Sequence, residues 1–209
     1  MKYDKEIAAH VIKNIALIEN SIKVIEDIEK ALFKAVEKIL ERKVRASELQ
    51  LGKDNNFNFW DEDRSYFSIE TWEAGAKEQY AWYYLDYHGD ESELKKLTRA
   101  LGENEDSKLN LHFTMDKAEL NLRKSVFKNL LRAEFEKSEA LHGMGFMLSE
   151  DGERIELTFH LDKELVAEEY PHFDECFDPL KQALDSVFEA HPIFEKIVEN
   201  IKQQAQVRK

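Results

Sequence analysis

The 209-residue chain has few of the residues that cross-link or interrupt a protein backbone. Its one cysteine, Cys176, excludes an internal disulfide, and seven glycines and three prolines leave little material for phosphate-binding loops or proline-rich linkers. No apolar run approaches the roughly 20 residues that a membrane-spanning helix needs. The first residues are charged and lack the apolar stretch of a signal peptide, so we expect a protein of the reducing cytoplasm that does not enter membranes.

The chain also has fewer basic than acidic residues. Lysine and arginine number 30 against 43 aspartate and glutamate residues, and the formal net charge is −13. Because the basic residues are dispersed among acids, no stripe is available for phosphates, and direct nucleic-acid binding is not expected. Surplus negative charge instead favours a basic protein partner through long-range steering, including a partner that itself binds nucleic acid.

Apolar residues recur at intervals of three and four through residues 4–45, without proline or glycine, and this pattern predicts a long amphipathic helix. We therefore divide the chain into residues 1–50, a helix or helical hairpin, and residues 51–209. A break near Asn20 would give the hairpin. A continuous rod would instead present an apolar seam to a second copy and form a homodimer. The seam residues are Ile15, Ile18, Ile22 and Ile25.

The rest of the chain alternates between strand and helix patterns. Strands are predicted within 66–72, 80–87, 109–115, 145–148 and 155–161 from alternating apolar side chains and hairpin signals. The fold class is therefore α+β: an antiparallel sheet of about five strands, covered on one face by helices, with the long N-terminal helix or hairpin attached.

The segments 108–117 and 154–163 resemble each other. Each begins with a basic residue, alternates apolar and polar side chains, and ends in Asp-Lys, so that Asp116 and Asp162 are predicted to cap helices. Either an internal duplication or the common succession of strand, cap and helix explains the likeness.

Further helices are expected at 91–101, 117–141 and 174–190. Pro192 is expected to separate the last of these from a final helix that ends near residue 203.

No known catalytic or metal-binding motif is present. The best chemical candidates are Asp86 and His88 at a strand end, with His112 and His160 on the polar sides of two other strands. If these strands are neighbours, their oxygen and imidazole groups could hold zinc or another divalent ion. The polar face of a half-solvated sheet explains the same residues without a metal.

The three tryptophans, Trp60, Trp72 and Trp82, lie in an aromatic-rich segment between residues 57 and 87. Exposed aromatic rings could stack on a carbohydrate or another small molecule, whereas buried rings would build the core or a protein interface. Carboxylates beside Trp60 could also hold Mg²⁺ in a phosphodiesterase or nuclease.

Among these alternatives we favour a non-enzymatic protein-interaction module without metal or cofactor. The alternatives kept open are a metal-dependent hydrolase and a small-molecule or carbohydrate-binding domain. The expected functional surface comprises Trp60, Trp72, Trp82, Asp86, His88, His112 and His160. Cys176 lies among acids that disfavour its thiolate, and we expect it to be a buried, unreactive side chain.

Overall fold

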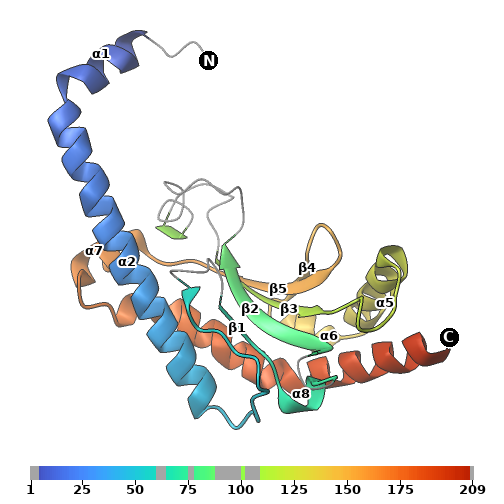
Figure 1. Ribbon diagram of the computed structural model, residues 1–209. Coiled ribbons are helices and arrows are strands. Elements are labelled where there is room, and N and C mark those ends of the chain that lie inside the picture. The colour runs from blue at the N-terminus through green and yellow to red at the C-terminus, as the bar shows by residue number, and fades with distance from the viewer. Residues whose placement is uncertain (1–4, 60–64, 75–77, 88–99, 102–108, 208–209) are drawn as a thin grey trace.

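The three-dimensional structure is a computed structural model of the chain. It describes residues 5–59, 65–74, 78–87, 100–101 and 109–207. A long helix runs along one side of the body and projects well beyond it (Figure 1). None of the described helices is long and apolar enough to cross a membrane.

The N-terminal segment forms two helices, α1 (Lys5–Lys13) and α2 (Ile15–Ala46), which meet at a bend at Asn14. The Asn14 side chain donates to the carbonyl oxygen of His10 at 2.9 Å, and its backbone N–H lies 3.1 Å from the same oxygen. This local competition for the carbonyl accompanies the change in helix direction. Since α2 is continuous across Asn20, the hairpin broken there is wrong; the long helix is confirmed over Ile15–Ala46, but it does not include residues 5–13, which form α1 beyond the bend.

Five strands form one antiparallel sheet in the order β1-β2-β3-β5-β4, as the α+β prediction requires. Their bounds are Ser65–Phe67 for β1, Ala81–Tyr87 for β2, Leu109–Met115 for β3, Met147–Leu148 for β4 and Arg154–Phe159 for β5.

The predicted strand at 66–72 is too long. It stops at Phe67 and is followed by a short 3₁₀ helix, η1 (Glu70–Trp72). Residues 68–70 hydrogen-bond instead to residues 50–52, through Gly52 N–H to the Ser68 carbonyl at 2.9 Å and Glu70 N–H to the Gln50 carbonyl at 2.8 Å. Beyond Phe67 the chain thus bridges to the extended segment around Leu51 instead of continuing its pairing with β2.

The two similar segments contain the neighbouring strands β3 and β5. Leu109 pairs with Phe159 and Leu111 with Leu157, so both strands turn apolar side chains to the same buried face. Asp162 caps helix α7 (Lys163–Glu169) as predicted, accepting from the backbone N–H groups of the first turn. Asp116 accepts similar bonds but begins only a turn, which closes through Asn121 at a φ of 53°.

In the described part of the chain after residue 109, the structure also has α5 (Lys124–Glu136), α6 (Glu139–Gly143), the 3₁₀ turn η3 (Glu175–Phe177) and α8 (Asp178–Val207). The helix predicted at 117–141 therefore begins later and is interrupted before α6. Pro192 lies inside α8, so its predicted role as a separator is wrong. Most of the helix predicted at 91–101 lies outside the described residues.

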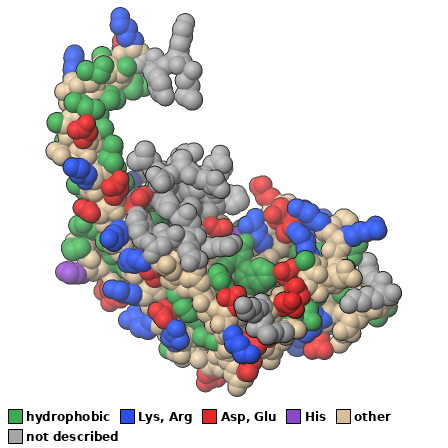
Figure 2. Space-filling view, in the orientation of Figure 1, with side chains coloured by type: hydrophobic (Ala, Val, Ile, Leu, Met, Phe, Trp, Pro, Cys, Tyr) green, Lys and Arg blue, Asp and Glu red, His purple; other side chains and the backbone are tan. Residues whose placement is uncertain are grey.

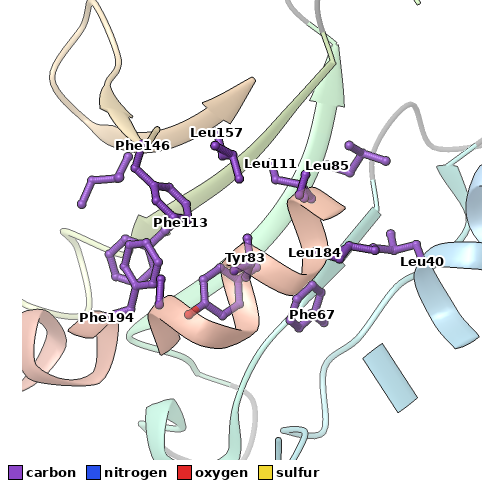
Figure 3. Close-up of a cluster of buried hydrophobic side chains, with 14 of the residues drawn as sticks. Leu40, Phe67, Tyr83, Leu85, Leu111, Phe113, Phe146, Leu157, Leu184 and Phe194 are labelled. Atoms are coloured by element: carbon purple, nitrogen blue, oxygen red, sulfur yellow. The ribbon is translucent and has the colours of Figure 1, made fainter. Parts of the chain in front are cut away.

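Helix α8 covers the apolar face of the sheet. Figure 3 shows Tyr83 and Phe113 pointing from the sheet toward Phe194 of α8, and the Phe113 and Phe194 rings stack with centroids 4.5 Å apart. Leu40 of α2 and Leu184 of α8 are both fully buried in this core. The C-terminal half of α2 thus belongs to the same core as the sheet, while its N-terminal half extends away from it (Figure 1).

Candidate interaction surfaces

The projecting part of α2 carries the predicted seam, which we call the isoleucine seam (Ile15, Ile18, Ile22 and Ile25). Ile15 is 50% exposed and Ile22 is 39% exposed, whereas Ile18 and Ile25 are half-buried. No residue between 5 and 28, all of which the structure describes, is fully buried. Figure 2 shows hydrophobic side chains along this helix beyond the body, so the molecule presents an apolar stripe to solvent.

The isoleucine seam continues directly into the core-facing side of the same helix. Its residues occupy the a and d positions of a seven-residue repeat, and the next such positions, Glu29, Leu32, Val36 and Ile39, are all buried. One helical face therefore has two environments. It is buried against the body from Glu29 onward and is open to solvent before that residue. This continuity explains why the periodicity is unbroken over the whole helix.

The outer face of the sheet was expected to be half-solvated, which holds for the half-buried outward side chains of β2 and β5 but not for the strand between them, β3. Asn110 is 3% exposed and His112 is 2% exposed, so β3 is buried on both faces. His112 stacks on Tyr84 with ring centroids 4.6 Å apart, and its Nδ1 lies 3.5 Å from Glu156 Oε2 on the other side. Tyr84, His112 and Glu156 thus form one cross-strand row over β2, β3 and β5.

The predicted metal candidates are only partly brought together. Asp86 pairs with Asn110, which places it on the same face as His112, one diagonal step away on the next strand. His160 follows the end of β5 and is exposed. His88 lies outside the described residues, as does Trp60. Within the part of the chain that the structure describes, no group of three or more His, Cys, Asp or Glu is arranged to hold a metal ion.

Neighbouring side chains hold the polar outer face together. Arg154 Nη1 donates to the Tyr84 hydroxyl at 3.2 Å, and Arg154 Nη2 lies 3.2 Å from the Asp151 carboxylate. Thr158 donates to Asn110 at 2.6 Å across the two central strands. Burial raises the pKa of Tyr84, so its hydroxyl stays neutral and can accept from the arginine. This arrangement stabilises the sheet.

The predicted aromatic surface separates into a buried and an accessible part. Trp72 is 1% exposed and packs against Tyr83, with ring centroids 5.1 Å apart, and against His191 at 5.3 Å. It belongs to the core and cannot stack on an external ligand, which corrects its assignment to the functional surface. Trp82 is half-buried on the outer side of β2 and lines a cleft.

This cleft, which we call the acidic cleft, has a volume of about 280 Å³. Its described lining residues are Asp54, Tyr66, Glu78, Gln79, Trp82, Asp116 and Glu119. These include four carboxylates and two aromatic rings but no lysine, arginine or histidine. Loss of hydration together with the charges of Glu78 and Asp116 raises the pKa of Glu119. The cleft is therefore a region of negative potential next to an aromatic face, suited to a cationic group.

Sequence reasoning missed the acidic cleft because its residues come from four separate segments and carry no shared motif. It also missed a buried pair, in which Tyr83 Oη lies 3.1 Å from His191 Nδ1. His191 Nε2 lies 3.6 Å from Glu195, which accepts from Thr71 at 3.0 Å. Burial raises the pKa of Tyr83 and lowers that of His191, so both are neutral near pH 7 and link β2 to α8.

Comparisons of the chain with protein-family models, with curated proteins and with solved structures found no match. The isoleucine seam and the acidic cleft are both open to solvent among the described residues.

Proposed function

We propose that the protein is a non-enzymatic interaction module that self-associates through the isoleucine seam. The observation that carries this proposal is the exposure of Ile15 and Ile22 on a helix that projects beyond the body. A soluble chain gains by covering such a stripe, and a second copy offers an identical stripe at whatever concentration the protein reaches. The homodimer is the smallest closed assembly that covers it.

The expected dimer is of moderate stability. Fully burying a large aliphatic side chain is worth about 1.5–3 kcal/mol, and the seam residues are already partly covered, so each contributes only a fraction of this. Association costs about 4–15 kcal/mol in lost freedom of motion. We therefore expect a concentration-dependent equilibrium between monomer and dimer instead of an obligate dimer.

Sedimentation velocity over a range of concentrations tests the proposal. Wild-type protein should sediment at up to twice the mass of the 24.6 kDa chain. The double variant Ile18→Asp/Ile22→Asp should be a folded monomer with an unchanged circular dichroism spectrum. The matched control Leu17→Asp/Val24→Asp changes two residues that are 66% and 54% exposed off the seam, and it should still dimerise. A wild-type protein that stays monomeric at every concentration would refute self-association.

A second candidate function is recognition of a basic protein in the cytoplasm. It is supported by the acidic cleft, where four carboxylates flank Trp82 and Tyr66. A lysine or arginine side chain placed there would gain both charge pairing and contact with an aromatic face. The net charge of −13 would attract such a partner from a distance. We propose a protein that binds nucleic acids as this partner, because such proteins carry lysine and arginine side chains that pair with phosphates.

An arginine-rich peptide measured by fluorescence polarisation tests the cleft. Glu78→Gln/Glu119→Gln should weaken binding about tenfold, and Trp82→Ala should weaken it as well. The control Glu168→Gln/Glu175→Gln removes the same charge from an exposed surface elsewhere and should change affinity less than twofold. Equal losses for the two pairs would show that only overall charge matters and would remove the cleft from the proposal.

A further inference from the structure

The isoleucine seam is symmetric about Asn20. Ile15 and Ile25 lie five residues to either side of Asn20, and Ile18 and Ile22 lie two residues to either side. A second helix that runs in the opposite direction can therefore place its own Ile25 against Ile15 and its own Ile22 against Ile18. Each a-position residue then packs against a d-position residue of the other copy, so the stripe is complementary to itself under a two-fold rotation.

The position of the body opposes the parallel alternative. The face that carries the seam is the face that packs onto the body from Leu32 to Val44. In two parallel copies with their seams in contact, both bodies would lie at the same end of the helix pair. Each body would then occupy the space between the two helices that the other copy needs, and the two would clash. Because the body lies at the C-terminal end of α2 (Figure 1), two antiparallel copies would place their bodies at opposite ends of the helix pair.

The seam also ends at comparable distances on either side of Asn20. On the N-terminal side the helix direction changes at Asn14, and on the C-terminal side the body covers the face from Glu29, which is 5% exposed. An antiparallel pair fits between these two limits, because each copy's bend then lies near the other copy's body.

We propose that two copies pair through an antiparallel α2–α2 contact whose two-fold axis crosses the seam face between Ile18 and Ile22, at the level of Asn20. This inference rests on the proposed self-association and adds the direction and the residue pairs of the contact. It also predicts a destabilising element: Glu19, at the flanking e position, meets the partner's Glu19 across the axis, since e positions face each other in antiparallel pairs. In a parallel pair Glu19 would face a g position instead, and the nearest of these are Asn14 and Ser21.

Disulfide cross-linking determines the direction. The native Cys176 is buried and does not compete, so Ile18→Cys and Ile22→Cys each add one accessible thiol. After subunit exchange under reducing conditions and mild oxidation, a mixture of the two variants should give a cross-linked dimer, whereas each variant alone should give little. The control mixture of Leu17→Cys and Val24→Cys, off the seam, should not cross-link. Cross-linking of each single variant with itself would overturn the antiparallel arrangement and leave self-association intact.

The dissociation constant of a Glu19 variant tests the antiparallel contact independently. Glu19→Gln should tighten the dimer about two- to fivefold, because it removes a like-charge contact. The control Asp27→Asn removes the same charge from a position that faces away from the seam, and it should leave the dissociation constant unchanged. Equal effects of the two substitutions would contradict the predicted Glu19 contact. A wild-type protein that is monomeric in the same sedimentation runs would refute the proposed function itself.

Discussion

Ile22 and Val36 occupy equivalent a positions on one face of α2, two repeats apart, yet Ile22 is 39% exposed and Val36 is 1% exposed. The sequence signal is the same at both sites. The difference arises because α2 is buried only from Glu29 onward, in the part of the helix that packs into the core with α8. The two halves of a single amphipathic stripe should therefore respond differently to the same kind of substitution.

We predict that Leu40→Ala lowers the free energy of unfolding by about 2–5 kcal/mol, because Leu40 is fully buried and its truncation leaves a cavity. Ile22→Ala should change the stability of the monomer by less than about 0.5 kcal/mol. Urea denaturation at a protein concentration low enough to dissociate any dimer measures both values. A loss for Ile22→Ala as large as that for Leu40→Ala would mean that the seam is already covered within one chain.

Periodicity alone predicted the α+β class, the five strands and the long helix, because each of these leaves a regular pattern in the sequence. It failed where two patterns compete. Pro192 is a strong helix breaker, but Val187 and Phe194 on its two sides are both buried in one core, and that packing keeps α8 continuous. The strand through residue 72 failed for a similar reason, since residues 50–52 compete for its backbone hydrogen bonds.

The surfaces were less predictable than the fold. The isoleucine seam could be found because its residues are close in sequence, although the pattern could not show where the body stops covering it. The acidic cleft joins residues such as Asp54 and Glu119, which only tertiary packing brings together. His112 showed the polar alternation of a solvated strand face, yet it is buried, because alternation does not report what lies over a sheet.

Glu153 should hold the β4–β5 hairpin to the neighbouring turn and helix α5. It pairs with Lys117 at 2.6 Å, with Lys128 at 3.3 Å and with Lys124, and these contacts lower its pKa to about 2. Because this value lies below the ordinary 4.5, the stabilisation is complete above pH 4.5 and is lost as the pH falls toward 2.

Glu153→Gln should therefore cost about 1 kcal/mol at pH 7, and this cost should shrink as the pH falls toward 2. The control Glu150→Gln alters an exposed residue of the same hairpin and should be neutral throughout. Denaturant titrations at several pH values measure both. A cost for Glu153→Gln that does not depend on pH would show that the ion pairs are not its cause.

The buried contact between Tyr83 and His191 should make stability depend on pH near neutrality. Burial lowers the pKa of His191 below its usual 6.5, so the unfolded chain takes up a proton first as the pH falls. Stability is therefore complete above about pH 6.5 and declines below it. His191→Gln should flatten this decline between pH 7 and 5. Tyr83→Phe should lower the free energy of unfolding by about 0.5–1.5 kcal/mol at pH 7, because it leaves His191 Nδ1 without the tyrosine hydroxyl as its hydrogen-bond partner. An unchanged pH dependence in His191→Gln would assign the decline to other groups.

Cys176 should be inert in the folded protein. It is 1% exposed, which confirms the expectation that it is buried. Burial, and after it the neighbouring Glu169, raises the pKa of the thiol to about 12, so little reactive thiolate is expected at pH 7. We predict negligible labelling by a maleimide at pH 7 over hours and complete labelling in denaturant. Fast stoichiometric labelling of native protein would reveal local opening around η3.

Pro192→Ala should stabilise the protein. A proline inside a helix lacks the N–H that would donate to the carbonyl four residues earlier, here that of Phe188, and it costs about 3 kcal/mol relative to alanine in a regular helix. Pro192 is exposed, so its replacement removes little packing. Because the native helix already accommodates the ring, we expect a gain of about 1–3 kcal/mol in the free energy of unfolding, measured by denaturant titration.

Glu189→Ala, at an exposed site on the same helix, should change stability by only a few tenths of a kcal/mol and serves as the control. A loss of stability in Pro192→Ala would contradict this prediction. It would mean that the backbone geometry which the proline imposes on α8 is needed to place the Phe194 ring against Phe113 in the core.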